Sequence, residues 1–154
     1  MKKRNLKGFT LIELIVVIAI IGVLAAILVP AMMGWVRKAS INSANANAKT
    51  VFTNAQTVAQ EFETVGQEVT VSSCGPTGGP SHPTTSKTFG ACVQENLTGD
   101  NNTWLVNVDK NIVTAAAAQT SGWCGGYPHS CPSTSSNKIS LAAALTNAGS
   151  GSWS

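Results

Sequence analysis

An uncharged apolar run of 23 residues, Leu14–Val36, is the feature that most constrains how this chain folds. A helix of that length is about 35 Å long, and about 20 apolar residues suffice to span the hydrocarbon core of a bilayer. Arg37 and Lys38 follow the run. Four basic residues lie in the first eight positions, namely Lys2, Lys3, Arg4 and Lys7. The stronger basic cluster is N-terminal, so the positive-inside rule places the N-terminus in the cytoplasm and the chain after Lys38 outside.

The positive charge of the chain is confined to its start. Over 154 residues, 10 Lys and Arg against 7 Asp and Glu give a formal net charge of +3. Without the four basic residues of the first eight positions, six basic residues remain against seven acidic ones, a net charge of −1. Because the region after Lys38 shows no basic patch, we expect no direct binding to nucleic acid.

Glu13 is the one charged residue between Phe9 and Val36. A carboxylate at the centre of a membrane span costs about 2.5–3.5 kcal/mol on insertion scales. Glu13 lies near the end of the span, so it is either an acid tolerated at the interface or one that pairs with a positive group in an assembly. A cleaved secretory signal is an alternative for this region, although its apolar stretch runs only about 7–15 residues.

The segment from Lys7 to Glu13, Lys-Gly-Phe-Thr-Leu-Ile-Glu, resembles the type IV prepilin cleavage and methylation motif. The resemblance implies that a prepilin peptidase cuts between Gly8 and Phe9 and N-methylates the new terminus at Phe9. It also implies that Glu13 neutralises the α-amine of a neighbouring subunit when the helices assemble into a filament. The resemblance covers roughly residues 1–40, and no motif beyond them identifies a subfamily.

Gly22 and Pro30 weaken the helix expected for the apolar run. Pro30 has no N–H and clashes with the preceding turn, while both residue types are frequent in membrane helices. An ordinary kink is therefore one interpretation. The family resemblance implies instead that the helix partly unwinds between Gly22 and Pro30 in the filament.

A second helical pattern follows Lys38. Its apolar residues recur at steps of three and four, which is typical of one buried helix face: Ile41, Ala44, Ala48, Val51, Ala55, Val58 and Phe62. The two patterns together predict one helix from Phe9 to about Glu63, roughly 80 Å long. Its second half is amphipathic, and the many alanines favour packing against a sheet over the alternative of a coiled coil.

Short strand-like and turn-rich segments follow Gly66. Thr103–Val108 is the clearest strand, and a return strand begins at Ile112 after a turn. Three segments are ambiguous or loop-like: 91–97 (helical turn or strand), 121–137 (loop) and 139–145 (strand or helix). We expect Trp104 in the sheet, and Trp123, Tyr127 and Trp153 in core packing or in lateral contacts.

These patterns predict an α+β chain, with a long N-terminal helix packed on a small antiparallel sheet, as in pilins. The expected parts are a basic leader (1–8), a membrane-spanning and assembly helix (9–36), the amphipathic half of the helix (37–64), and a β-rich extracytoplasmic head (65–154).

Four cysteines lie in the head: Cys74, Cys92, Cys124 and Cys131. Four cysteines allow three pairings, and sequence neighbours favour Cys74 with Cys92 and Cys124 with Cys131. An oxidising compartment favours disulfides, each of which typically stabilises by about 2–4 kcal/mol. A zinc site of Cys124, Cys131 and His129 is an alternative, but the short CxxC pairs of structural zinc sites are absent.

The sequence contains no arrangement typical of catalysis. His82 and His129 have no Ser or Asp partner motif, and no phosphate-binding loop is present. We therefore expect no enzyme activity, no metal and no cofactor.

The family resemblance implies a structural subunit of a type IV pilus that supports adhesion, motility or DNA uptake. Its partners would be copies of itself, minor pilins, the prepilin peptidase and an inner-membrane assembly platform. The chain would begin as a single-pass precursor in the cytoplasmic membrane and end at the cell surface. The alternatives are a pseudopilin of a type II secretion or competence system, or a membrane-anchored adhesin that never polymerises.

Overall fold

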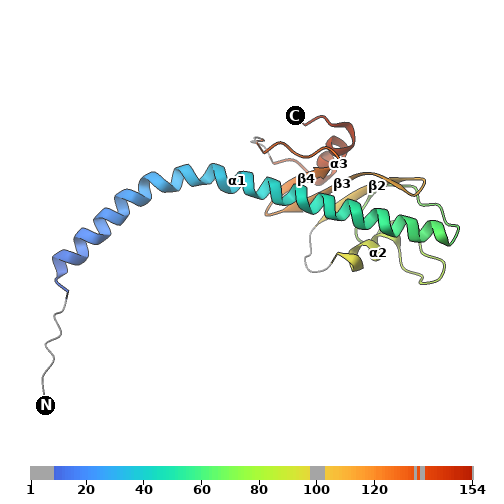
Figure 1. Cartoon of the computed structure of the whole chain (residues 1–154), viewed down its shortest axis with the longest axis horizontal. Helices are drawn as coiled ribbons and strands as arrows, with labels where there is room; N and C mark the ends of the chain where they lie inside the picture. Colours follow the sequence, from blue (N-terminus) through green and yellow to red (C-terminus); the bar gives the residue numbers. More distant parts are fainter. Residues whose placement is uncertain (1–8, 98–102, 134, 136–137, 154) are drawn as a thin grey trace, which may run out of the picture. The chain divides into compact units, whose positions relative to one another are not determined.

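The computed structural model describes residues 9–97, 103–133, 135 and 138–153. One long helix, α1 (Leu11–Thr64), begins the described part of the chain and continues through Pro30 (Figure 1). The predicted helix over residues 9–63 is thereby confirmed to within two residues at its start and one at its end. The chain divides into two compact units, Met1–Val36 and Arg37–Ser154, and α1 contributes to both.

In the first unit, α1 carries apolar side chains around its whole circumference. All its large hydrophobic residues up to Val36 are exposed in the single chain, for example Leu11 (75%), Leu14 (63%) and Trp35 (75%). The helix is long and apolar enough to cross a membrane. An exposed apolar surface of this extent marks a site of membrane or protein contact.

In the second unit, α1 buries one stripe. The seven predicted stripe positions, from Ile41 to Phe62, are all buried, and Ala59 joins them. Val51, Val58 and Phe62 share a core with Trp104 and with the other strands. Fully burying such a large apolar side chain stabilises by roughly 1.5–3 kcal/mol. The prediction of a helix packed on a sheet is confirmed, and the α+β fold class with it.

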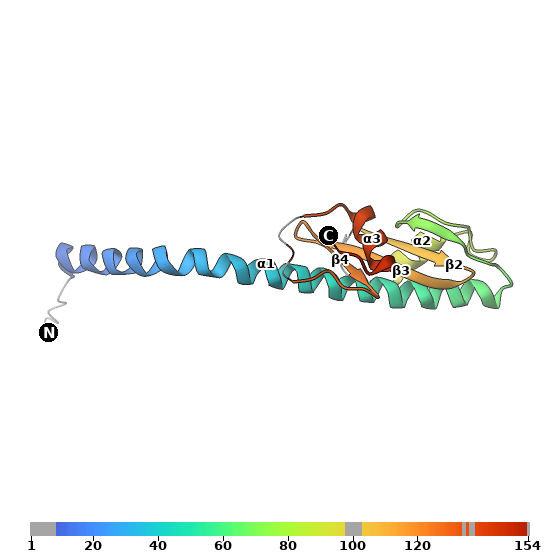
Figure 2. The ribbon, with the colours of Figure 1, turned by 90° about the horizontal axis from the view of Figure 1, so that it is seen from above.

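The sheet has four antiparallel strands in the order β1-β2-β3-β4. The strands lie along the second half of α1 (Figure 2). Their bounds are Val71–Cys74 for β1, Trp104–Asp109 for β2, Ile112–Thr120 for β3 and Trp123–Tyr127 for β4. Two-residue turns join β2 to β3 and β3 to β4: Lys110-Asn111 and Ser121-Gly122, all four residues having positive φ. Positive φ at both turn positions matches the right-handed twist of the flanking strands.

Strand β4 lies within the segment 121–137 that was expected to be a loop, so that expectation is wrong for these five residues. Gly125 and Gly126 argue against a strand on propensity alone. A Cβ on Gly125 would lie 2.2 Å from the backbone nitrogen of Asn45 in α1. Glycine therefore allows β4 to touch the helix backbone directly, and this packing outweighs its low strand propensity.

Strand β3 contributes to two cores because successive side chains of a strand point to opposite faces. Ala116 and Ala118 join the core with α1, whereas Ala115 and Ala117 pack against α3 (Leu141–Ser150). The ambiguous segment 139–145 is therefore helical from Leu141. Its N-cap is Ser140, whose side chain accepts a hydrogen bond from the N–H of Ala143.

The ambiguous segment 91–97 is also helical as far as Asn96, in α2 (Phe89–Asn96), and Leu97 is the C-cap of that helix. Phe89 and Val93 of α2 enter the core with α1. Trp104 is fully buried as expected, and its indole N–H donates to Oε1 of Gln94 at 2.7 Å. Helix α2 thus satisfies the one polar atom of the largest buried side chain.

Candidate functional site

The start of α1 brings together the residues expected to act in assembly. Thr10 directly precedes the helix, and its Oγ1 accepts a hydrogen bond from the N–H of Glu13 at 3.4 Å. In return, Glu13 Oε2 accepts from the Thr10 N–H at 2.8 Å and from the Thr10 hydroxyl at 2.7 Å. This reciprocal arrangement is a capping box, which satisfies donors that a helix start leaves unpaired.

The capping box explains how an acid is held next to an apolar helix in the single chain. The Glu13 carboxylate keeps polar partners within one turn, and its negative charge lies at the positive end of the helix dipole. Phe9, one residue before the box, is 91% exposed. The box therefore places the acid beside the first residue of the predicted mature chain, at the same helix end.

Thr10 was not among the residues singled out by the sequence analysis. The signal was present as Thr-x-x-Glu before an apolar run, which is the sequence signature of a capping box. Gly8 and the rest of the leader lie outside the described residues, so the cut between Gly8 and Phe9 remains a prediction. The same holds for methylation at Phe9 and for the pairing of Glu13 with a neighbour.

Gly22 and Pro30 both lie inside α1. A Cβ added to Gly22 would have no neighbour within 4 Å, so packing within this chain does not require glycine there. The unwinding expected between Gly22 and Pro30 concerns the filament and stays a prediction.

All four cysteines are free thiols in the structure, so the pairing of Cys74 with Cys92 and of Cys124 with Cys131 stays a prediction. Burial raises the pKa of each thiol. The charge of Cys131 further raises the pKa of Cys124. Cys74 belongs to the core with α1, and Cys92 packs against that same core.

Asn45 in α1 fixes the backbone at Cys131. Its side-chain oxygen accepts from the N–H of Gly126 at 3.2 Å and from that of Cys131 at 2.9 Å. Its side-chain nitrogen donates to the carbonyl of Cys131 at 2.8 Å. The sequence analysis missed this role, because Asn45 bonds to residues 81 and 86 positions away and no local pattern signals such contacts.

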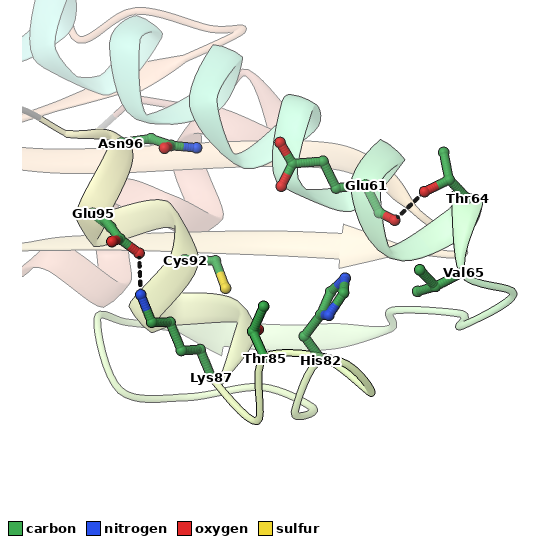
Figure 3. Close-up of a pocket in the computed structure, with 9 residues that line it drawn as sticks. All are labelled: Glu61, Thr64, Val65, His82, Thr85, Lys87, Cys92, Glu95 and Asn96. Carbon is green, nitrogen blue, oxygen red and sulfur yellow. Dashed lines mark hydrogen bonds and ion pairs between the residues drawn. The ribbon is translucent and has the colours of Figure 1, made fainter.

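A surface groove of about 380 Å³ opens at the end of α1, beside α2 and the loop before it (Figure 3). Six of the side chains that line it are Glu61, Val65, His82, Lys87, Cys92 and Glu95. Lys87 Nζ and Glu95 Oε2 form an ion pair at 2.6 Å, and the ring of His82 stands edge-on to Phe62 at 4.8 Å between centroids. His82 is therefore half-buried by packing.

Within the described residues, no group of three His, Cys, Asp or Glu side chains is arranged to hold a metal ion. His129 is exposed and its ring faces Gly151. The structure thus lends no support to the zinc alternative at Cys124, Cys131 and His129.

Comparison with known proteins adds a family match at the N-terminus. Residues 3–29 match the model of the prokaryotic N-terminal methylation motif. A fimbrial protein of Moraxella nonliquefaciens is 58% identical over 38 residues, which is 25% of each chain. The type IV major pilin protein PilA of Myxococcus xanthus is 45% identical over 47 residues, which is 30% of this chain and 21% of that protein.

A secretion protein is similar to this chain as well. The type II secretion system core protein G of Pseudomonas aeruginosa is 41% identical over 51 residues, 33% of this chain and 36% of that protein. The chain therefore matches only about a fifth to a third of the length of these curated relatives. No solved structure matches significantly.

Proposed function

We propose that the protein is a structural subunit of a type IV pilus, because residues 3–29 match the prokaryotic N-terminal methylation motif and the N-terminal part of the chain is similar to a fimbrial protein and to a type IV major pilin protein. The most direct support is that the segment matching the motif overlaps a helix whose large apolar side chains are all exposed as far as Val36. In this proposal the subunit catalyses no reaction. Its apolar helix crosses the cytoplasmic membrane first and then packs against copies of itself.

The proposed processing begins in the precursor. A prepilin peptidase cuts between Gly8 and Phe9 and methylates the new α-amine of Phe9. The four basic residues before the cut keep that end in the cytoplasm until then. After the cut, the mature chain begins one residue before the Thr10–Glu13 capping box.

The proposed assembly step pairs the α-amine of Phe9 with Glu13 of a neighbouring subunit. Two opposite charges that leave the bilayer edge together avoid the cost of burying either one alone. The capping box already orients the Glu13 carboxylate through Thr10, so less side-chain freedom is lost when the neighbour's amine arrives. Within the filament, the segment from Gly22 to Pro30 partly unwinds.

The second unit forms the outer surface of the filament. We propose that Cys74 pairs with Cys92 and Cys124 with Cys131 once this unit, including the β-rich head (65–154), lies outside the cytoplasm. The contact of Cys74 and Cys92 with the same core supports the first pair, and the electrostatic interaction of Cys131 with Cys124 supports the second. The partners are copies of the chain, minor pilins and an inner-membrane assembly platform, and the filament serves adhesion, motility or DNA uptake.

A pseudopilin is the second candidate, because the similarity to the secretion protein covers more of this chain than either pilin match quoted above. Both candidates share cleavage, methylation and the apolar helix. They differ in the length and location of the filament.

The test is mass spectrometry of the N-terminus combined with electron microscopy of filaments sheared from cells that express the chain with a prepilin peptidase. We expect long surface filaments whose subunits begin with N-methylated Phe9. Short filaments confined to the cell envelope would favour the pseudopilin. A chain that keeps residues 1–8 and stays monomeric in detergent would contradict both and favour a membrane-anchored adhesin.

A further inference from the structure

The charged residues of α1 are segregated along the helix. Between Glu13 and Glu61 the helix carries no acidic residue and three basic ones: Arg37, Lys38 and Lys49. Glu61 and Glu63 then follow in its last turn. The part of α1 that belongs to the second unit is therefore basic at its start and acidic at its end.

Lys49 and Glu61 leave α1 on different sides. They are 12 positions apart, which places their side chains roughly 120° apart around the helix and about 18 Å apart along its axis. The buried stripe from Ile41 to Phe62 lies in the wider arc between them. The two charges therefore flank the core from opposite sides.

The side of the second unit that carries Lys49 is a basic flank beside β4, formed by two lysines and two aromatic rings. Lys49 Nζ lies 6.0 Å from the ring centroid of Tyr127, and Lys138 Nζ lies 5.6 Å from that of Trp123. Such cation–π contacts restrict the lysine side chains without neutralising their charge. Both lysines are exposed, and neither forms an ion pair with another residue that the structure describes.

The side that carries Glu61 is an acidic flank, formed by the groove of about 380 Å³ at the end of α1. The Glu61 side chain extends from α1 toward α2 (Figure 3). Glu95 on the wall of this groove already has a cation, because Lys87 Nζ lies 2.6 Å from its Oε2. Glu61 is exposed and has no ion pair within the described part of the chain. The groove therefore offers one carboxylate with room beside it for a further cation.

We propose that the basic flank of one subunit docks against the acidic flank of a second copy of the chain, with Lys49 of the first paired to Glu61 of the second. The two flanks lie on opposite sides of one subunit, so each copy can use both at once. A head-to-tail contact of this kind builds an open filament when its rotation does not close a ring. This inference rests on the proposed function and adds which surfaces of the subunits meet.

Electrostatics favours copies that are shifted along α1. In the proposed filament the apolar helices pack together, so neighbouring copies run in the same direction. Without a shift, parallel copies would place basic beside basic and acidic beside acidic, which is repulsive. A shift of about 18 Å brings Lys49 to the level of Glu61. Because both side chains are exposed, this pair sets the register of the subunits and adds little to their affinity.

The first experiment treats filaments sheared from cells with a carbodiimide, which joins an amine to a carboxylate without a spacer. We expect an amide between Lys49 and Glu61, identified by mass spectrometry after digestion. Within one chain these residues lie about 18 Å apart along a helix, so the link forms only between copies and should give dimers and longer ladders in denaturing electrophoresis. The Lys87–Glu95 pair is the internal control, because it lies within one chain at 2.6 Å.

The second experiment reverses the charges. Lys49→Glu and Glu61→Lys should each lower the yield of filaments by roughly tenfold, because each places like charges together at the contact. The double variant should recover to within about threefold of the unmodified chain. Lys110→Glu and Glu63→Lys are the matched controls, with the same charge changes at exposed positions outside the two flanks. They should change the yield by less than about twofold.

The unfolding midpoint of each purified variant in detergent should equal that of the unmodified chain, so that a loss of filaments reports docking. If a single variant fails to fold, the crosslink in the unmodified chain decides alone.

Filaments that give the Lys87–Glu95 link without the Lys49–Glu61 link would overturn the inference and leave the pilus subunit standing. Single variants that lose filaments without recovery in the double variant would have the same consequence. Short filaments of the cell envelope that carry the Lys49–Glu61 link would support the contact and assign it to a pseudopilin. If the unmodified chain forms no filament at all, both proposals are wrong.

Discussion

The Glu13 carboxylate accepts two hydrogen bonds from Thr10, from the backbone N–H at 2.8 Å and from the hydroxyl at 2.7 Å. The acid proposed to bind a neighbour's amine is thus already held by its own chain. Oε2 is the acceptor of both hydrogen bonds. The same side chain therefore has a local role in helix capping and a proposed role in assembly, and different substitutions can separate the two.

Substitutions of Glu13 test whether filament formation requires the negative charge of this side chain. Both Glu13→Gln and Glu13→Ala should be cleaved after Gly8 and should fail to form filaments, because neither supplies the negative charge for the neighbour's amine. Glu13→Gln keeps an oxygen that can accept from Thr10, so it retains the helix cap. Mass spectrometry of the N-terminus and electron microscopy of sheared material measure the two effects. Abundant methylated filaments from Glu13→Gln would show that the charge is dispensable.

Substitution of Thr10 tests the capping box itself. Thr10→Val removes the hydroxyl and should destabilise the helix start by about 0.5–2 kcal/mol. Amide hydrogen exchange of the first helical turn, measured on the full chain in detergent micelles, should become faster. Thr10→Ser keeps the hydroxyl and serves as the control, and equal exchange in the two variants would argue against the box.

Asn45→Ala should destabilise the second unit, because it leaves the N–H groups of Gly126 and Cys131 without their acceptor. A buried group left unsatisfied costs about 1–3 kcal/mol. Denaturant unfolding of the reduced full chain in detergent should show a lower midpoint. Asn42→Ala, on the exposed face of the same helix, should change it by less than about 0.5 kcal/mol. Similar midpoints for both variants would contradict the role assigned to Asn45.

Gly125→Ala should weaken the contact of β4 with α1. The added Cβ would lie 2.2 Å from the nitrogen of Asn45, which is backbone and cannot move aside cheaply. We expect a loss of about 1–3 kcal/mol or more in the free energy of unfolding, as for other overpacked cores. Gly149→Ala is the control, because its Cβ would meet Ala115 at an ordinary 3.6 Å within a helix. That substitution should be neutral or slightly stabilising.

Oxidation should stabilise the second unit through Cys124 and Cys131. The midpoint of unfolding should fall on reduction, by an amount equivalent to about 2–4 kcal/mol for each disulfide lost. Cys124→Ser should remove the part of that effect that is due to this pair. A chelator should leave the midpoint unchanged. Loss of stability with the chelator and not with the reductant would instead restore the zinc alternative.

Much of the fold follows from patterns that are local in the chain. The apolar run and the stripe from Ile41 to Phe62 predicted α1 and its buried face. Helical periodicity depends only on residues three or four positions apart, so it is visible in the sequence. The segment around Gly8, Phe9 and Glu13 pointed to the N-terminal methylation motif without any structure, and residues 3–29 match the model of that motif. The capping box could have been predicted in the same way from Thr10 and Glu13.

Other features depend on contacts between segments that are far apart in the sequence. Strand β4 exists because Gly125 fits against Asn45 of α1, a relation that no window of neighbouring residues contains. The difference between a half-buried Cys92 and a buried Cys74 depends likewise on how the loop after β1 packs on α2. Periodicity records which side of an element faces inward, whereas close packing between elements is set by shape in three dimensions. The long apolar helix and the methylation motif could therefore be predicted from residue order, while the exposure of each thiol and the fourth strand emerged only when the chain was folded.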